Sequence, residues 1–544
     1  MRLTPFAKLF ITVVVLAVVG YAAWHYKGAD IRKWATGNDK GAQTTTSAVS
    51  NNDFDSLKNA PADPSRDAGV NGVSSVGVSA GKLNRPLVVA INTWAGHSPG
   101  IVFNNGMEPS DASSYRRKYG LDVKFVLIED PAAKLAAFRK GDVDIMWNTV
   151  DNWAREASIL AENGQKAKSV IMQDWSRGGD GIVSVASINS IEQLKGGHKI
   201  ACTQFTPSHF LLLYLLSQSG LSAQDRADVE KNIIFTQDAP AAAAMFKAKQ
   251  VDAAVTWEPD LSGAVTARGD EAHVLVSTTA ATNIIADTLC ARQDIIDKAP
   301  ESVRDFVHGW LDGIEMMKTD PANAYAIVGK SLKLDTDTVS GMLSGLKLTP
   351  YADNAQFYGL SGGKAHFETL FDTAFVIWRK KGLVTRSVEA KDWVDTRFLS
   401  ALASNYTTQK VEEQKIAAKA PSKNDRAIIN KQIEVHFTPG SDEIMPGSFF
   451  VLDSLGDTMT SFGNTYLRVE GNTDATGSPT ANMTLSERRA LAVKNYIAKT
   501  FPNIEVTRFQ TIGRGSTNPV ADNKTEAGRQ LNRRTEIKVV LATQ

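Results

Sequence analysis

The sequence has few cysteines and almost no net charge. Only Cys202 and Cys290 occur among 544 residues, so neither a disulfide framework nor a cysteine-rich metal site is available. A bridge between the two is open in principle, but each lies in a separate apolar run typical of a buried strand, which favours free thiols. The formal net charge of +1 lacks the basic excess of nucleic-acid-binding proteins, so we expect no nucleic-acid partner.

Motifs for catalysis or for metal binding are also scarce. The sequence contains no G-x-x-x-x-G-K-[ST] phosphate loop and no H-E-x-x-H zinc motif. "GGDGIV", around Asp180, has neither the spacing of a phosphate loop nor a following lysine. His97 and His209 stand without the clustered carboxylates of a metal site. We therefore expect no enzyme, no cofactor and no bound metal.

Long hydrophobic runs are limited to the N-terminus, where no charge occurs from Leu9 to Trp24 and Arg2 and Lys8 precede. This pattern indicates either a signal peptide cleaved near residue 22 or an uncleaved membrane anchor. We favour the anchor, over residues 1–26, with a single span and the rest of the chain exported. Residues 27–84 are rich in Ser, Thr, Asn and Gly and cannot bury enough apolar area to fold, so they predict a disordered tether.

Two globular blocks remain, residues 85–405 and 426–544, joined by a linker at 406–425. In the first block, helical and strand-like stretches alternate, which predicts an α/β domain with a largely parallel sheet. "DPAAKLAAFRKGDVDIMW" from Asp130 is repeated weakly as "DAPAAAAMFKAKQVDAAVTW" from Asp238. Because ligands bind beyond the carboxyl ends of strands in such sheets, Trp94, Trp147 and Trp257 predict an aromatic-lined cleft.

Four stretches of this block, "INTWAGHSPGI", "KLAAFRKGDVDIMW", "GGDGIVSVASINSIEQLKGGHKIACTQFTPSHFLLLYLL" and "AAAAMFKAKQVDAAVTWEPDLSGAV", carry a family resemblance. Over roughly 300 residues the block resembles the type-2 periplasmic solute-binding proteins of the nitrate/sulfonate/taurine group. The resemblance implies two α/β lobes that close on a small solute at their hinge and often present it to an ABC permease. It places the following residues at the ligand: Trp94, His97, Trp147, Asn148, Asp180, Thr206, Ser208, His209, Trp257 and Glu258.

The charge of the solute stays open. We expect Ser208 to cap a helix that ends at Gly220. The start of such a helix would suit an anionic head group. Asp180, Glu258 and Asp260 favour an amine or a hydroxyl, although they also suit structural hydrogen bonds at a hinge. An anion, a sulfonate, an amine or a heterocycle is compatible with this set.

The second block alternates strands and helices in a βαβαββ-like α+β order. A helix over "TLSERRALAVKNYIAKTF" is expected to carry Glu487 in its first turn. "EGNTDATGS", "LSERRALAVKNYI" and "IGRGSTNPVADNKTEAGRQLNRRTEIKV" resemble the OmpA-like peptidoglycan-binding domain. The resemblance implies that Asp474 takes the ammonium and Arg489 the carboxylate of a diaminopimelate stem. The remaining pocket residues that it implies are Thr473, Asn482, Leu485, Asn532 and Arg533.

Two details of this block are also expected from the sequence. Asn472 replaces a histidine common in the family, and Arg534 is expected on the outer face of the last strand. The combined prediction is a solute receptor in the periplasm of a Gram-negative bacterium, anchored in the inner membrane and attached to peptidoglycan. The alternative is a structural or regulatory envelope protein whose solute domain serves as a sensor or an interaction platform.

Overall fold

The computed structural model describes residues 77–363, 365–411, 421–422, 425, 427–433, 435–438, 440–502 and 504–541. The expected anchor at 1–26 and most of the expected tether lie outside these residues. None of the helices within the described ranges combines the length and the apolar character needed to cross a bilayer.

A short hairpin opens the described chain, inside the range expected as tether. It consists of β1 (Val78–Ser79) and β2 (Lys82–Leu83). Lys82 forms an ion pair of 2.8 Å with Asp305, and the Leu83 amide donates to the Ser302 hydroxyl at 3.0 Å. The packed part of the protein therefore begins a few residues before the expected boundary at 85.

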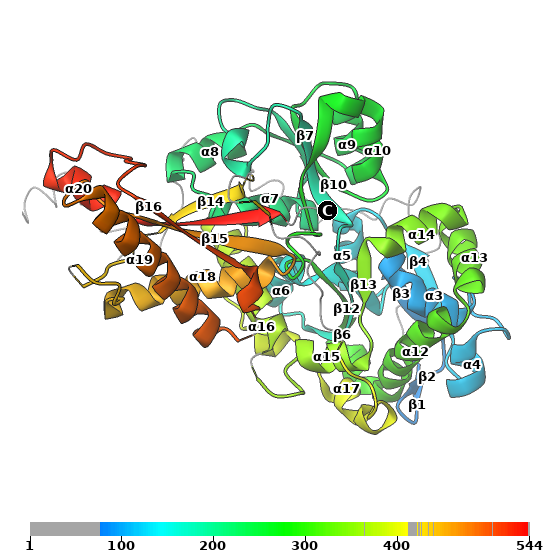
Figure 1. Ribbon diagram of the computed structural model, residues 1–544. Helices are drawn as coiled ribbons and strands as arrows, with labels where there is room; N and C mark the ends of the chain where they lie inside the picture. The colour runs from blue at the N-terminus through cyan, green and yellow to red at the C-terminus, as the bar shows by residue number, and fades with distance from the viewer. Residues whose placement is uncertain are drawn as a thin grey trace, which may run out of the picture. The chain divides into compact units, whose positions relative to one another are not determined.

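Lobe 1 is built on a six-stranded sheet of order β13-β6-β12-β5-β3-β4 (Figure 1). The strands β3, β4 and β5 are parallel, whereas β12 is antiparallel to both of its neighbours, β5 and β6. The strands are β3 (Leu87–Ile91), β4 (Val123–Leu127), β5 (Ile145–Thr149), β6 (Ala167–Ser176), β12 (Ala286–Arg292) and β13 (Leu346–Leu348). The helices of this lobe are α3 (Ser98–Asn104), α4 (Ser114–Tyr119), α5 (Pro131–Lys140), α6 (Val150–Glu162), α11 (Gln293–Lys298), α12 (Pro300–Thr319), α13 (Pro321–Leu332), α14 (Thr336–Ser344), α15 (Tyr351–Phe357), α16 (His366–Lys380) and α17 (Arg397–Ala401).

Lobe 2 is an insertion between β6 and β12, with a five-stranded sheet of order β11-β7-β10-β8-β9. The chain enters it between Ser176 and Asp180 and leaves it between Ser277 and Ala286. The strands are β7 (Asp180–Val185), β8 (Ile200–Thr203), β9 (Ile233–Thr236), β10 (Ala253–Trp257) and β11 (Ala272–Ser277). The helices are α7 (Pro207–Gln218), α8 (Ala223–Lys231), α9 (Ala239–Lys247) and α10 (Asp260–Arg268).

The internal repeat is confirmed as one helix–strand unit in each lobe. Asp130 caps α5 by accepting hydrogen bonds from the amides of Ala132 and Ala133, and Asp238 caps α9 through the amide of Ala241. The strands that follow are β5 in lobe 1 and β10 in lobe 2. The expected free thiols are also confirmed, since Cys202 lies buried in β8 and Cys290 in β12.

The helices α3 and α12 approach closely because glycine lies at their contact. A Cβ atom on Gly313 would lie 2.1 Å from the Pro99 carbonyl oxygen, which is backbone and cannot move aside. We therefore expect Gly313→Ala to lower the free energy of unfolding by about 1–3 kcal/mol. Denaturation followed by tryptophan fluorescence measures this, since no tryptophan follows Trp393 in the sequence.

Gly341→Ala is the matched control for Gly313→Ala. Gly341 lies inside α14, with no atom within 4 Å of an added Cβ. Alanine is favoured over glycine in a helix by up to about 1 kcal/mol, so this change should be neutral or stabilising. Equal effects of the two substitutions would contradict the close packing of α12 on α3.

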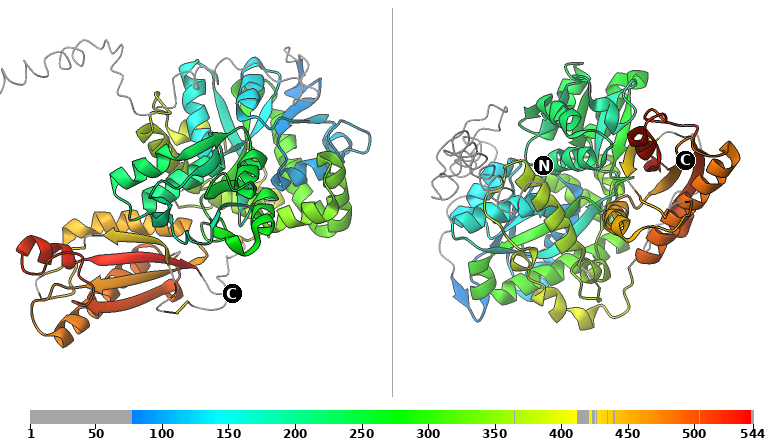
Figure 2. Two further views of the ribbon diagram at one scale, coloured as in Figure 1. Left: turned by 90° about the horizontal axis from the view of Figure 1, so that it is seen from above. Right: turned by 90° about the vertical axis from the view of Figure 1, so that its left-hand side faces the viewer.

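The C-terminal domain has a four-stranded sheet of order β14-β17-β15-β16, which Figure 2 follows by colour from yellow β14 to red β17. The strands are β14 (Ala427–Ile433), β15 (Thr465–Asn472), β16 (Phe509–Gly515) and β17 (Thr535–Leu541), and the helices are α18 (Phe449–Ser461), α19 (Pro479–Thr500) and α20 (Glu526–Asn532). α19 begins earlier than expected, at a Ser478 cap that accepts from the Ala481 amide. Glu487 is therefore not in its first turn.

Candidate functional sites

The interlobe site is the junction of the two segments that connect the lobes. One runs between Ser176 and Asp180, and the other between Ser277 and Ala286. The Thr278 hydroxyl lies 2.8 Å from the Ser176 hydroxyl and accepts from the Gly178 amide at 2.8 Å, so a single side chain ties both crossings together. Trp94 is 5% exposed and packs here against Met342 and Leu346, with Trp257 at the edge of the same cluster. Two of the three expected aromatic residues therefore meet at the junction.

Four carboxylates gather at this junction, and we call them the carboxylate cluster: Asp151, Asp174, Asp180 and Asp287. Asp287 of β12 lies directly opposite Asp174 of β6, a pairing of like charges that is unfavourable in a sheet. The Trp94 indole N–H points to the Asp174 carboxylate at 3.4 Å. Asp180 begins β7 in lobe 2, and Asp151 lies in the first turn of α6.

Burial raises the pKa of each member of the cluster, and the charge of a nearby carboxylate, which for Asp180 is Glu258, adds to the rise. Burial is the main cause, and it brings the pKa of Asp151 and Asp180 to about 7 and that of Asp174 to about 8. The charge of Asp180 adds to the rise in the pKa of Asp151 and Asp174. Burial, followed by the charges of Asp174, Asp180 and Asp151, raises the pKa of Asp287 well above its ordinary value.

These raised pKa values predict that stability falls as the pH rises. In the unfolded chain an aspartate titrates near pH 3.9. Between that pH and about 7–8, the folded protein binds more protons than the unfolded chain, so its free energy of unfolding decreases with pH. We expect Asp180→Asn to flatten this loss by about 1–3 kcal/mol between pH 5 and pH 8, because it also removes a repelling charge.

Fluorescence-detected denaturation at the two pH values measures the change in stability. Asp337→Asn, at an exposed position in α14, is the control and should keep the wild-type dependence. An Asp180→Asn protein with the full wild-type loss would show that the buried carboxylates do not control the pH dependence.

Arg155 is the only arginine side chain in α6 and lies 1% exposed near the carboxylate cluster. Its Nε donates to the Asn152 side chain at 3.1 Å, and its guanidinium lies 4.2 Å from the centre of the Phe205 ring of lobe 2. Its Nη1 and Nη2 have no hydrogen-bond partner among the described residues. The same is true of both carboxylate oxygens of Asp151 and of Oδ1 of Asp180.

Thr206, Ser208 and His209 open α7, but their roles differ from the expectation. Thr206, not Ser208, is the N-cap residue, because Pro207 occupies the first turn, and its hydroxyl donates to the Thr203 carbonyl at 2.7 Å. The helix ends at Gln218, before Gly220. The Ser208 hydroxyl is fully buried without a partner in the described chain. His209 packs edge-on against Phe235, and burial lowers its pKa to about 3.

Trp147, Asn148 and His97 each have hydrogen-bond partners within lobe 1. The Trp147 indole donates to the Ile128 carbonyl at 3.1 Å, and Asn148 donates to Glu156 at 2.7 Å. His97 lies between the side chains of Gln173 and Asn92, each 2.7 Å from a ring nitrogen, and burial lowers its pKa to about 4. Both ring nitrogens of His97 are therefore occupied by neighbouring side chains.

Glu258 and Asp260 lie beside the junction at the start of α10. The Glu258 carboxylate accepts from the hydroxyl of Ser262 at 2.7 Å, which is a capping contact. Asp260 lies 3.9 Å from Lys247, and burial raises its pKa. Both residues have the structural partners that a hinge position suggests.

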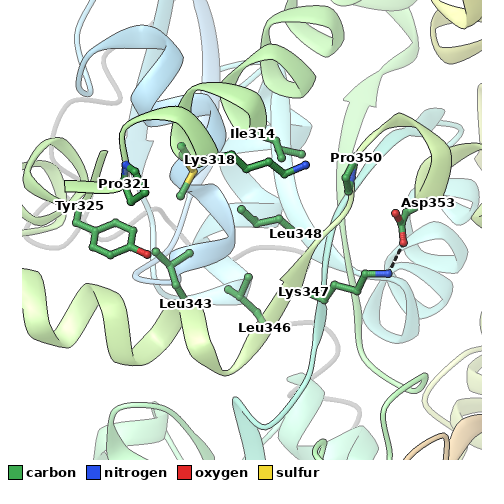
Figure 3. Close-up of a pocket in the computed structure, with 11 residues that line it drawn as sticks. Ile314, Lys318, Pro321, Tyr325, Leu343, Leu346, Lys347, Leu348, Pro350 and Asp353 are labelled. Carbon is green, nitrogen blue, oxygen red and sulfur yellow. Dashed lines mark hydrogen bonds and ion pairs between the residues drawn. The ribbon is translucent and has the colours of Figure 1, made fainter. Parts of the chain in front are cut away.

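A surface pocket of about 360 Å³ lies between α12, α13, α14 and β13 (Figure 3). Leu343, Leu346 and Leu348 line it and also belong to the cluster around Trp94, so they separate the pocket from the interlobe site. Its wall carries an ion pair of 2.5 Å between Lys347 and Asp353. None of the expected ligand residues lines this pocket.

One sequence with the spacing of a catalytic motif lies outside the structural context that the motif requires. Residues 77–81, "GVSAG", have the G-x-S-x-G spacing of a nucleophile elbow. Ser79 is an exposed residue of the two-residue strand β1, and a β-turn follows it rather than a helix. The strand–turn–helix context of an elbow is therefore missing at this position.

The second candidate site is a charged pocket at the carboxyl end of β15. Asp474 forms an ion pair of 2.7 Å with Arg533 and accepts from the Thr476 amide at 2.7 Å. Arg489 of α19 donates through Nε to the Ser441 carbonyl at 3.1 Å and lies 4.8 Å from the centre of the Phe437 ring. Arg489 and Arg533 line a cavity of about 130 Å³. Asp474 therefore already has one cationic neighbour, which sequence reasoning did not pair with it.

The pKa shifts of Asp474 and Arg489 agree with these contacts. Burial opposes ionisation of Asp474, but the hydrogen bonds from Arg533 and Thr476 and the charge of Arg533 together outweigh it and lower the pKa. Burial lowers the pKa of Arg489, and the charge of Asp474 partly restores it. Asp474 and Arg489 thus act on each other's charge without forming a direct ion pair.

The remaining residues of this pocket shape its loops. Asn482 donates to the Asp474 and Thr476 carbonyls at 3.3 and 3.0 Å, and the Thr473 hydroxyl donates to the Asp474 carbonyl at 2.9 Å. Asn532 accepts from the amides of Val520 and Ala521 and donates back to the Ala521 carbonyl. Leu485 is partly exposed on α19.

Arg534 is not on an outer face, so that expectation is wrong. It is 3% exposed, contacts the Glu536 carboxylate, and lines the same cavity as Arg489. The strand β17 begins only at Thr535, so Arg534 precedes the alternation of the strand. Arg488 is a better exposed comparison, since its side chain is 51% exposed.

Comparison with known proteins identifies both domains. Residues 110–324 match the family described as NMT1/THI5 like, and residues 436–533 match the OmpA family. The chain therefore carries an NMT1/THI5-like domain and a C-terminal OmpA domain.

Relatives of the OmpA domain include several envelope proteins. Outer membrane porin F of Pseudomonas aeruginosa is 36% identical over 112 residues, which cover 21% of this chain and 32% of that protein. Outer membrane protein A of Bordetella avium is 50% identical over 70 residues, covering 13% and 35%. Peptidoglycan-binding protein ArfA of Mycobacterium bovis is 34% identical over 96 residues, covering 18% and 29%. The chain spans about a third of the length of these curated relatives.

Solved structures similar to the larger domain are distant. The aliphatic sulphonate binding protein SsuA of Escherichia coli is 19% identical with a TM-score of 0.45, covering 57% of this chain and 98% of that one. The nitrate-binding protein NrtA of Synechocystis PCC 6803 is 11% identical with a TM-score of 0.46, covering 60% and 89%.

Proposed function

We propose that this protein is a non-enzymatic periplasmic solute receptor that is held on peptidoglycan by its C-terminal domain. The observation that carries the first half is the set of buried, unpartnered polar atoms that both lobes contribute: those of Asp151 and Arg155 in lobe 1 and of Asp180 and Ser208 in lobe 2. Buried polar groups are normally hydrogen-bonded. Atoms without partners at a hinge are suited to a solute that bridges the lobes.

The second half of the proposal rests on the charged pocket of the OmpA domain. Arg489 lines a small cavity, and Asp474 is ion-paired to Arg533 of the same cavity, so one charge of each sign is close to it. A diaminopimelate side chain carries an ammonium and a carboxylate on one carbon, which such a pair can bind together. ArfA, a relative of this domain, is described as a peptidoglycan-binding protein.

The proposal extends to the position of the protein in the cell. An uncleaved anchor at residues 1–26 would hold the chain in the inner membrane of a Gram-negative bacterium, and an ABC permease would receive the solute. N-terminal sequencing of the protein extracted from membranes tests the anchor. A mature N-terminus near Ala22 would show that this segment is cleaved and would contradict the proposal. The domain boundaries are proposed as anchor 1–26, a tether that begins at 27 and ends before the hairpin at 78–83, a solute domain from that hairpin to 405, linker 406–425 and OmpA domain 426–544.

A solute panel tests the receptor role. Binding to the native state alone raises the melting temperature by mass action, and Trp94 at the interlobe site should change its fluorescence. We expect at least one member of a panel of anions, sulfonates, amines and heterocycles to produce both effects. If no member does, the alternative of an envelope sensor or interaction platform replaces the receptor, while sedimentation with purified sacculi tests wall binding independently.

A further inference from the structure

Two buried side chains of opposite charge lie one helical turn apart in α6 without pairing. Asp151 is 0% and Arg155 1% exposed. Residues four apart on a helix are neighbours, and opposite charges at this spacing ordinarily attract each other into contact. Here the carboxylate oxygens of Asp151 and the Nη atoms of Arg155 all lack a hydrogen-bond partner among the described residues. Because an unpaired buried charge is costly, this separation requires a reason.

The position of Arg155 is fixed by its neighbours. Its Nε donates to Asn152, whose amide in turn donates to Glu156 at 3.0 Å, and Phe205 of lobe 2 packs against the guanidinium. The two Nη groups form a fork suited to bidentate contact with an oxyanion. The unpartnered Ser208 hydroxyl lies in the first turn of α7, two residues after Thr206, where free backbone amides also favour an anion.

Carboxyl groups, which can carry negative charge, form the other part of the interlobe site. Oδ1 of Asp180 is unpartnered, the charge of Asp180 acts on Asp174, and the charges of all three other members act on Asp287. Carboxyl groups with raised pKa values become ionised when a positive charge binds beside them, so this end of the site favours a group that carries positive charge and hydrogen-bond donors. A protonated amine has both properties.

We propose that the interlobe site takes a zwitterionic small molecule, whose ammonium is held by Asp151 and Asp180 and whose oxyanion is held by Arg155 and Ser208. This inference rests on the proposed receptor function and narrows its solute. A nitrate ion or an unsubstituted alkanesulfonate fills only the Arg155 end and leaves Asp151 unpaired. An alkylamine fills only the carboxylate end.

Selection from three defined pools tests the charge of the solute. The full chain, stripped of bound molecules, is dialysed against zwitterions (α- and ω-amino acids and aminosulfonates), cations (alkylamines and polyamines) or anions (alkanesulfonates, carboxylates and nitrate). Mass spectrometry then identifies what is retained. We expect retention from the zwitterion pool, and a loss of about 100-fold in affinity of the retained compound for Asp151→Asn and for Arg155→Gln.

Retention only from the anion pool or only from the cation pool would overturn the inference and leave the receptor function standing. Affinity that is unchanged in both variants would also overturn it. Retention from no pool would contradict the receptor function together with the inference.

A second measurement needs no ligand. In the stripped protein at pH 8, Asp151→Asn should raise the melting temperature, because it removes an ionised carboxylate that has no partner. The control is Asp144→Asn, at an equally buried aspartate that accepts from Arg85 at 2.6 and 2.9 Å and from the Val88 amide at 3.0 Å. This change should lower the melting temperature. A lower melting temperature for Asp151→Asn would assign Asp151 a structural role and overturn the inference.

Discussion

Asp474→Ala and Arg489→Ala are each expected to abolish sedimentation of the protein with purified sacculi. Arg489 lines the cavity, and Asp474 is ion-paired to Arg533, which lines it too, so each substitution removes a charge from the site. The opposite charge of the ligand is then left buried without a partner, which typically costs about 2–5 kcal/mol. That cost corresponds to a loss in affinity of roughly 30-fold to several thousand-fold.

Arg488→Ala is the matched control for Arg489→Ala, since the two arginines are adjacent on α19. The Arg488 side chain is half exposed, and its nearest acidic partner, Asp442, lies 3.6 Å away. Exposed ion pairs contribute little, so this variant should bind sacculi like the wild type. Circular dichroism should show that all three variants fold, and wild-type binding by a folded Asp474→Ala, Arg489→Ala double variant would refute the assignment of the pocket.

Glu156→Ala is expected to destabilise the solute domain by about 3–5 kcal/mol, because it leaves Lys134 buried without its counter-ion. Both side chains are 0% exposed, with Nζ of Lys134 3.2 Å from the Glu156 carboxylate. The Lys134 ammonium keeps only the Trp147 carbonyl at 3.2 Å and the face of the Trp147 ring. Fluorescence-detected denaturation measures the loss.

The compensating variant replaces both charges, Lys134→Met with Glu156→Gln. It removes the uncompensated ammonium and keeps an amide that can hydrogen-bond to Asn148 or Asn152. Replacing a whole buried pair is far less costly than breaking it, so we expect this variant to regain most of the stability. If Glu156→Ala alone unfolds like the wild type, Lys134 does not depend on the pair.

The sequence predicted the architecture better than the interlobe site. Periodicity and the repeat from Asp130 and Asp238 were sufficient for two α/β lobes, since caps and apolar strands are local features. Trp147 and Asn148 were predicted at the ligand because of their place after a strand. The structure also joins them to the buried pair of Lys134 and Glu156, a contact between α5, β5 and α6 that no local pattern reveals.

Asp151 and Arg155 were missed for a related reason. Charges four residues apart in a helix are typical of a solvated face, and nothing in "VDNWAREASILAE" indicates that this face is covered. The covering elements come from far along the chain. Trp378 of α16 donates to the Asp151 carbonyl at 2.8 Å, and Phe205 of lobe 2 covers Arg155. The one indication in the sequence that Asp151 and Arg155 are buried is that the other positions of this helix are largely apolar.

Strand order also determines when each sheet can close during synthesis. β12 lies between β5 and β6 although the whole of lobe 2 is made before it, and β17 lies between β14 and β15 although it is the last strand of its domain in chain order. Until these strands emerge, the earlier strands of both sheets expose unpaired edges, which are prone to pair with other chains. A nascent chain halted before Thr535 would keep β14 and β15 in that state, so the sheet of this domain closes only when its final strand is available.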